Sequence, residues 1–254
     1  MDPIVLALLL AALVGVSLGL LGGGGSILTV PILTYVVGME PREAIASSLF
    51  IVGATSAVSA IGHAKAGRVR WRTGLIFGGA GMAGAFAGGL LGGLIPGAVL
   101  MVLFALMMIV TATAMIRGRS NTSDAPARTA SATRVVIDGF AVGIATGLVG
   151  AGGGFLIVPA LNLLGGLPMA VAVGTSLLVI TMKSFAGLGG YLLSVSLDWP
   201  LLAAFTGTAI AASFLGVSLA GRLPERALRT GFGIFVLIMG VFVLAQELPA
   251  LFTS

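Results

Sequence analysis

Three long stretches of the sequence contain no charged side chain, and they constrain the fold more than any other feature. They are residues 3–39, 73–116 and 139–182. A helix needs about 20 apolar residues to cross the hydrocarbon core of a bilayer, so each stretch can cross once or twice. In lipid the backbone must bond within a helix or a closed barrel, and the alternation of barrel strands is absent. The sequence therefore predicts an all-α polytopic membrane protein.

Composition supports this prediction and divides the chain. Hydrophobic residues make up 58% and charged residues 8% of the sequence, whereas soluble domains carry about 25% charged residues. A first transmembrane repeat is expected at 1–116, a polar cytoplasmic linker at 117–134 and a second repeat at 135–254. We expect 8–10 membrane helices, some of them broken or re-entrant, within ten apolar segments: 4–21, 27–39, 44–62, 73–94, 97–116, 135–149, 155–167, 169–194, 200–220 and 230–248.

A glycine-rich motif occurs once in each half. Residues 19–33 read GLLGGGGSILTVPIL, and 128 positions later residues 147–161 read GLVGAGGGFLIVPAL, with nine of fifteen positions identical. We call these the first and second glycine motifs. Glycine-interrupted apolar segments at corresponding places in two halves point to the binding site of a repeat-built transporter.

The positions of the charges predict how the halves are oriented. Basic residues collect in cytoplasmic loops, and nearly all of those in this chain lie in the 63–72 loop, the linker and the 222–229 loop. Most acidic residues outside these regions lie in the other loops or near the termini, and basic and acidic regions fall on opposite sides when the ten segments cross in turn. Both termini are therefore expected on the side opposite the basic loops. An odd number of segments per half then orients the halves oppositely, so we expect two inverted-topology repeats of about five segments each.

The two glycine motifs are the first candidates for a binding site. Each glycine costs roughly 1 kcal/mol relative to alanine in a helix, so the backbone there is expected to be unwound and to line a cavity. The following helices would point free N–H groups into it, which suits an anion. The alternative is close helix packing, which we favour for Gly84, Gly88 and Gly92. The candidate backbone donors are Gly22, Gly23, Gly24, Gly25, Ser26, Gly150, Gly152, Gly153 and Gly154.

Polar side chains after each motif form a second set of candidates. One helical stripe contains Ser48, Thr55, Ser56, Ser59 and His63, and the same stripe 128 residues on contains Ser176, Lys183, Ser184, Gly187 and Tyr191. We select as hydroxyl donors Ser47, Ser48, Thr175 and Ser176.

Lys183 is the charged residue that lies deep in an apolar segment. A charge in such a position usually marks a substrate pathway or a counter-ion. The alternatives are snorkelling to an interface and a structural pair with Asp138. For His63, which opens a basic loop, we favour a solvated loop residue over a proton relay.

The remaining residues exclude several other functions. The chain has no cysteine, and no zinc-protease or P-loop motif, no intramembrane carboxylate pair and no dinucleotide fold is found. We therefore expect no enzyme, no metal and no cofactor. The net charge is +5, and the basic residues lie mostly in short loops between apolar segments. They therefore indicate membrane topology and not a nucleic-acid binding surface.

With GLLGGGGSILTVPIL followed by ASSLF, and GLVGAGGGFLIVPAL followed by GTSLL, the chain resembles the sulfite exporter TauE/SafE family, also called the toluene sulfonate uptake permease family. The resemblance covers both halves. It implies a multi-pass permease of the bacterial inner membrane for sulfite, organosulfonates or related small anions.

The function expected from these observations is a secondary transporter that exposes a midplane anion site alternately to each side. Its partners would be the anionic substrate and the lipid bilayer, and a homo-oligomer is left open. The alternatives are an anion channel and a non-transporting membrane scaffold subunit.

Overall fold

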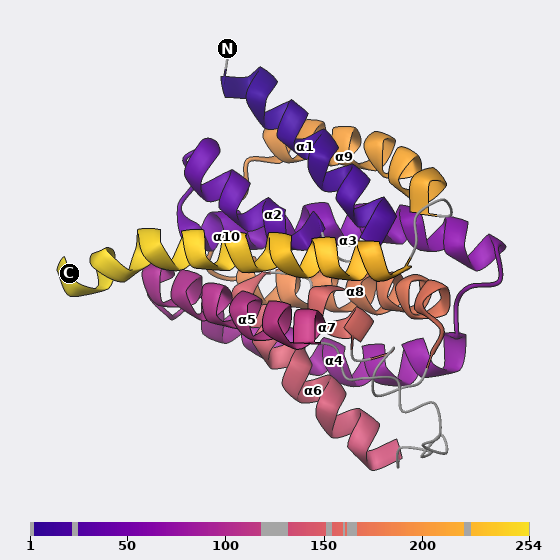
Figure 1. Ribbon diagram of the computed structural model, residues 1–254. Coiled ribbons are helices and arrows are strands. Elements are labelled where there is room, and N and C mark those ends of the chain that lie inside the picture. The colour runs from indigo at the N-terminus through magenta and orange to yellow at the C-terminus, as the bar shows by residue number, and fades with distance from the viewer. Residues whose placement is uncertain are drawn as a thin grey trace.

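The computed structural model describes residues 3–21, 25–117, 132–150, 154–159, 161, 167–220 and 225–253, and within these ranges it contains helices and no strand. Each of the ten predicted apolar segments contains a helix (Figure 1). The elements are α1 (Pro3–Leu21), α2 (Gly25–Pro31), the π-helical turn η1 (Ile32–Val36), α3 (Pro41–Lys65), α4 (Trp71–Gly92), α5 (Gly97–Arg117), α6 (Ala132–Val149), α7 (Gly154–Pro159), α8 (Met169–Tyr191), α9 (Trp199–Ala220) and α10 (Glu225–Thr253).

The helices within the two glycine motifs are short. α2 has 7 residues and continues into the 5 residues of η1, and α7 has 6 residues. None of these reaches the ~20 residues needed to cross a bilayer. Both lie where the sequence predicts an interrupted, half-length segment, and α2 contacts α7.

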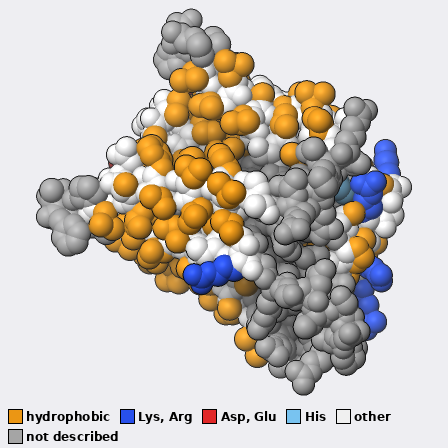
Figure 2. All heavy atoms as spheres, viewed as in Figure 1, with side chains coloured by type: hydrophobic (Ala, Val, Ile, Leu, Met, Phe, Trp, Pro, Cys, Tyr) orange, Lys and Arg blue, Asp and Glu red, His pale blue; other side chains and the backbone are white. Residues whose placement is uncertain are grey.

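Four helices of the described chain are long and apolar enough to cross a membrane, namely α3, α4, α8 and α9. Shorter apolar helical stretches occur in α1, α2 with η1, α5, α6 and α10. Hydrophobic side chains cover much of the visible surface, and Lys and Arg side chains gather at the end where α3 turns into α4 (Figure 2). The protein is an integral membrane protein with an outer surface suited to lipid.

The central pair is α3 and α8, and three further pairs pack around it (Figure 1). α1 packs on α9, α4 packs on α6, and α5 packs on α10. α9 also contacts α3, and α4 also contacts α8, so the first two pairs flank the centre.

Glycines allow close helix contacts in both flanking pairs. In the α1–α9 pair, a Cβ on Gly15 or Gly19 would meet the carbonyl oxygen of Ala209 or Ser213. In the α6–α4 pair, a Cβ on the corresponding positions, Gly143 and Gly147, would meet the carbonyl oxygen of Gly81 and Ala85. Each contact therefore recurs at the 128-residue offset with the two halves exchanged.

The packing interpretation of the glycines in α4 is confirmed. A Cβ on Gly84 would meet the carbonyl oxygen of Phe140, and one on Gly88 would meet that of Ile144. A Cβ on Gly92 would meet the hydroxyl of Tyr191. These glycines let α4 approach α6 and α8.

Candidate functional site

The centre of the molecule is an antiparallel contact between α3 and α8. A Cβ on Gly53 would lie 3.2 Å from Cβ of Ser184, and one on Gly174 would lie 3.1 Å from Cβ of His63. Moving from Gly53 to His63 along α3 corresponds to moving from Ser184 to Gly174 along α8, so the two helices run in opposite directions. Thr55 and Lys183, which are 128 residues apart, both lie within one helical turn of the contact between Gly53 and Ser184.

The polar stripe of α3 is buried inside the molecule. Thr55 and Ser56 are fully buried, and Ser59 and His63 are 4% and 3% exposed. None of their side-chain polar atoms has a hydrogen-bond partner within the described residues. Buried polar groups are almost always bonded, so a run of unbonded ones marks a place for water or a ligand.

Lys183 lies on α8 at the level of Thr55, and its side chain packs against Phe77 and Gly81 of α4. Its side chain is 1% exposed, and Nζ has no hydrogen-bond partner in the described part of the chain. Nζ lies 5.6 Å from the centroid of the Phe77 ring, a distance at which the ring attracts a cation. A Cβ on Gly81 would lie 2.8 Å from Cδ of Lys183, so this glycine makes room for the stem. With its side chain buried, Lys183 does not snorkel to solvent.

The adjacent Ser184 adds a further polar group. Its hydroxyl is fully buried and has no hydrogen-bond partner within the described ranges. At the level of the central contact the two helices thus carry a buried cation and unbonded hydroxyl groups, which are donors of the kind that bind small anions. Asp138, the proposed structural partner of Lys183, belongs to α6, and its side chain lies outside the described residues.

The hydroxyls selected from the sequence lie away from Lys183. Ser47 is buried and its hydroxyl has no partner in the described structure. Ser48 donates to the carbonyl of Gly150 at 3.1 Å, which ties α3 to the second glycine motif. Both residues precede Thr55 by about two helical turns.

Thr175 and Ser176 lie toward the opposite end. The Thr175 hydroxyl accepts a hydrogen bond of 3.0 Å from the backbone N–H of Arg70, and the Ser176 hydroxyl donates to the carbonyl of Val173 at 2.7 Å. Both precede Lys183 by about two turns. The fold therefore brings Ser48 to Gly150 but does not gather the four hydroxyls around Lys183.

The glycine motifs are only partly described. Gly22, Gly23, Gly24, Gly152 and Gly153 lie outside the described residues. Gly25 begins α2, with Ser26 as its second residue, and Gly154 begins α7. Gly150 has a φ of +69°, a left-handed conformation that favours glycine, and it packs against Ile45 of α3.

The two ends of the central pair are built differently. Tyr191 ends α8, is fully buried and donates from its hydroxyl to the carbonyl of Leu148 at 2.6 Å. His63 occupies the corresponding position on α3 and is also buried, but neither ring nitrogen has a partner within the described ranges. The expectation that His63 is a solvated loop residue was wrong.

The turn after α3 explains the burial of His63. Gly67 has a φ of +68°, its N–H donates to the carbonyl of Ala64, and the N–H of Arg68 donates to the carbonyl of His63. This Schellman motif ends the helix and carries the carbonyl of Arg68 toward Gly174. The chain thus folds over His63, which the position of the residue in the sequence does not reveal.

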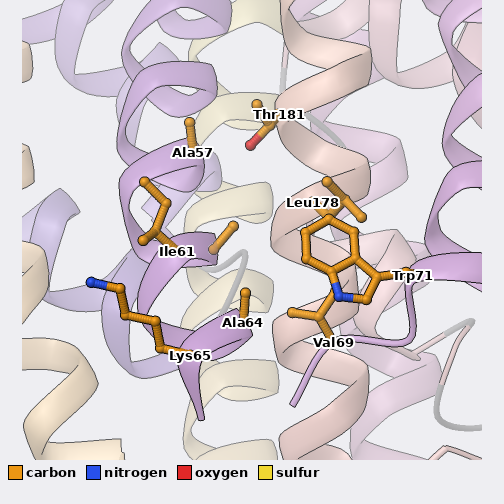
Figure 3. A pocket seen from close by; sticks show the side chains of 9 residues that line it. Ala57, Ile61, Ala64, Lys65, Val69, Trp71, Leu178 and Thr181 are labelled. Carbon is orange, nitrogen blue, oxygen red and sulfur yellow. The ribbon is translucent and has the colours of Figure 1, made fainter. Parts of the chain in front are cut away.

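A cavity of about 390 Å³ lies beside α3, between its C-terminal half, the start of α4 and α8 (Figure 3). Its lining is almost entirely apolar and includes Ile61, Trp71 and Leu178, with Lys65 extending away from Trp71. The lining positions of α3 are on a different face from Ser56, Ser59 and His63. The cavity is therefore separate from the buried polar stripe, and its lining includes Lys65 and Thr181 as polar residues.

The stripe predicted on α3 is buried in the structure, but several of its unbonded hydroxyls are not among the residues selected from the sequence. Thr55, Ser56, Ser59 and Ser184 have hydroxyls that are buried and unbonded within the described residues. Their spacing on two stripes that correspond at 128 residues was the available signal. Among the described residues, no group of three or more His, Asp or Glu side chains lies close enough together to hold a metal.

Comparison with known proteins identifies relatives over nearly the whole chain. The model of the family described as "Sulfite exporter TauE/SafE" matches residues 7–243. A probable membrane transporter protein of Xylella fastidiosa (strain 9a5c) is 37% identical over 246 residues, covering 94% of both chains. The probable membrane transporter protein YdhB of Bacillus subtilis (strain 168) is 27% identical and covers 94% of this chain and 99% of its own. No solved structure matches this chain significantly.

Proposed function

Because this chain belongs to the sulfite exporter TauE/SafE family, we propose that this membrane transporter carries small sulfur-containing anions, such as sulfite or organosulfonates, by alternating access. The observation that carries the proposal is Lys183, a cation that is 1% exposed, has no hydrogen-bond partner within the described residues, and lies at the level of the central helix contact, where both helices carry unbonded hydroxyls. An anion bound there would offset much of the cost of burying that charge.

The arrangement of the helices supports two inverted repeats. The glycine contacts of α1 with α9 recur in α6 with α4 when each position is shifted by 128 and the halves are exchanged. α3 and α8 occupy equivalent positions and run antiparallel, so an axis that relates them must be perpendicular to both helices. In a membrane protein such an axis lies in the membrane plane, which is the geometry of inverted-topology transporters.

This axis would pass beside Thr55 and Lys183, because their positions correspond and both lie next to the central contact. A site on the axis can be reached from either side as one half moves against the other. We propose that Lys183, Thr55, Ser56 and Ser184 form the midplane site. The glycine motifs would line it with backbone N–H groups, and Ser47, Ser48, Thr175 and Ser176 would lie along the paths to it.

The charged loops support an orientation in the bacterial inner membrane with the α3–α4 loop facing the cytoplasm. Lys65, Arg68, Arg70 and Arg72 are exposed in the loop between α3 and α4, where the positive-inside rule places the cytoplasm. The linker of residues 117–134 would lie on the same side.

Counterflow in liposomes tests the proposal. Purified protein is reconstituted with unlabelled sulfite inside, and uptake of radiolabelled sulfite, methanesulfonate or sulfoacetate is measured. A carrier is expected to accumulate label transiently by exchange and to saturate with concentration. Flux that neither saturates nor exchanges would support the channel instead, and absence of flux for all three anions would support the scaffold.

A further inference from the structure

His63 is a buried titratable group that the proposed site does not use. It is the chain's only histidine, its side chain is 3% exposed, and neither ring nitrogen has a hydrogen-bond partner in the described structure. An imidazole can satisfy two polar contacts, one at each nitrogen. Leaving both unmade is costly unless another molecule occupies the space.

The described surroundings of His63 contain cationic groups and no acid. α8 presents Gly174, which has no side chain. The loop after α3 presents Arg68, which interacts electrostatically with the ring. Lys65, on the same helix, is exposed, and the described residues of α7 contain no titratable side chain. A protonated ring would therefore lack a negative partner within the described residues while the site is empty.

A row of polar groups connects His63 with the central site. Ser59 and Ser56 lie about one and two turns back along the same stripe of α3, and their hydroxyls are also unbonded within the described ranges. Thr55 lies at the level of Lys183, eight residues before His63, which corresponds to about 12 Å along the helix.

We infer that His63 takes up a proton when the transported anion binds, so that anion binding and protonation of the imidazole are coupled. The inference rests on the proposed function. The proton comes from hydronium in the water at the end of the α3–α4 loop, and a new N–H bond forms on the imidazole. Water accepts the proton again when the anion leaves, and no other bond changes.

The physical reason is electrostatic linkage. The negative charge of a bound anion favours the protonated imidazole, and the protonated imidazole favours the anion by the same factor. Two unit charges about 12 Å apart interact by about 1.4 kcal/mol at an effective dielectric constant of about 20. This corresponds to a change in affinity of about tenfold.

The single histidine makes the test direct, because one imidazole gives one set of signals. The protein is labelled with ¹⁵N-histidine, placed in nanodiscs and titrated between about pH 5 and pH 8, with and without methanesulfonate, whose charge is constant over that range. Binding of methanesulfonate, sulfite and sulfoacetate is measured by calorimetry on the same sample. We expect bound methanesulfonate to move the imidazole titration upward by about one pH unit.

The control is His63→Gln, which keeps a polar side chain but cannot take a proton. This variant should bind methanesulfonate at pH 8 with an affinity similar to that of the native protein, and it should lose the roughly tenfold gain on acidification. Anion binding with an unchanged histidine titration would overturn the inference and leave the proposed function intact. Absence of binding by all three anions would contradict the proposed function itself, and the inference with it.

Discussion

The two central helices carry corresponding positions that the fold uses differently. Toward the α3–α4 loop, α3 presents Ser56, Ser59 and His63, whose polar atoms have no partner in the described structure. The counterparts on α8 are Ser184, Gly187 and Tyr191, and there the row ends in a fully buried tyrosine bonded to the carbonyl of Leu148. This difference indicates that the row on α3 has unbonded groups for polar occupants, whereas Tyr191 closes the corresponding row on α8.

The flanking pairs, in contrast, are alike. α1 meets α9 and α6 meets α4 through glycines at corresponding positions, with the same kind of backbone contact. The flanking pairs therefore form a symmetric frame around the asymmetric central pair.

The largest effect is expected from filling the glycine contacts of the frame. Gly19→Ala and Gly147→Ala each place a methyl group on a backbone carbonyl that cannot move aside, which costs about 1–3 kcal/mol through overpacking. Both variants should lower the thermal unfolding temperature in detergent by a similar amount. The matched controls are Gly207→Ala on α9 and Gly79→Ala on α4, where nothing lies within 4 Å of the added Cβ. A large loss in one pair and none in the other would argue against equivalent halves.

A smaller effect is expected in the central pair, where the polar row on α3 should be more accessible to a reagent in water than the corresponding row on α8. The chain has no cysteine, so Ser59→Cys and Gly187→Cys each introduce a single thiol at corresponding positions. An impermeant thiol reagent applied from the side of the α3–α4 loop should modify the cysteine at position 59 roughly tenfold faster than the one at position 187, a difference of about 1.4 kcal/mol in accessibility. Equal rates at the two positions would remove the distinction between the two rows.

Much of the fold could be predicted from the sequence because it depends on segment length and apolar content. The uncharged stretches fixed the helical class, and the 128-residue repeat located the short helices α2 and α7. The sequence also indicated that Gly84, Gly88 and Gly92 serve packing. The absence of space for even one methyl group at Gly88 depends on the position of α6, which no local pattern reveals.

The site was less predictable because it depends on contacts between distant residues. The stripes on α3 and α8 could be read from helical periodicity, and Lys183 from its charge. The burial of His63 results from the turn at Gly67 and the approach of Gly174. Likewise, Ser48 bonds to Gly150 and Thr175 to Arg70, so two hydroxyls selected from the sequence make tertiary contacts that the sequence does not specify.

The central claim is that Lys183 binds the transported anion, and its most direct test is sulfite affinity in Lys183→Met. Methionine is similar in length but neutral, so affinity in the folded variant should fall at least about tenfold, or ~1.4 kcal/mol. Lys183→Arg should be intermediate, because its charge is kept but its planar shape differs. If Lys183 instead forms a structural pair with Asp138, the methionine variant should misfold and Asp138→Asn should rescue it. Unchanged affinity and flux in a well-folded Lys183→Met protein would contradict the account.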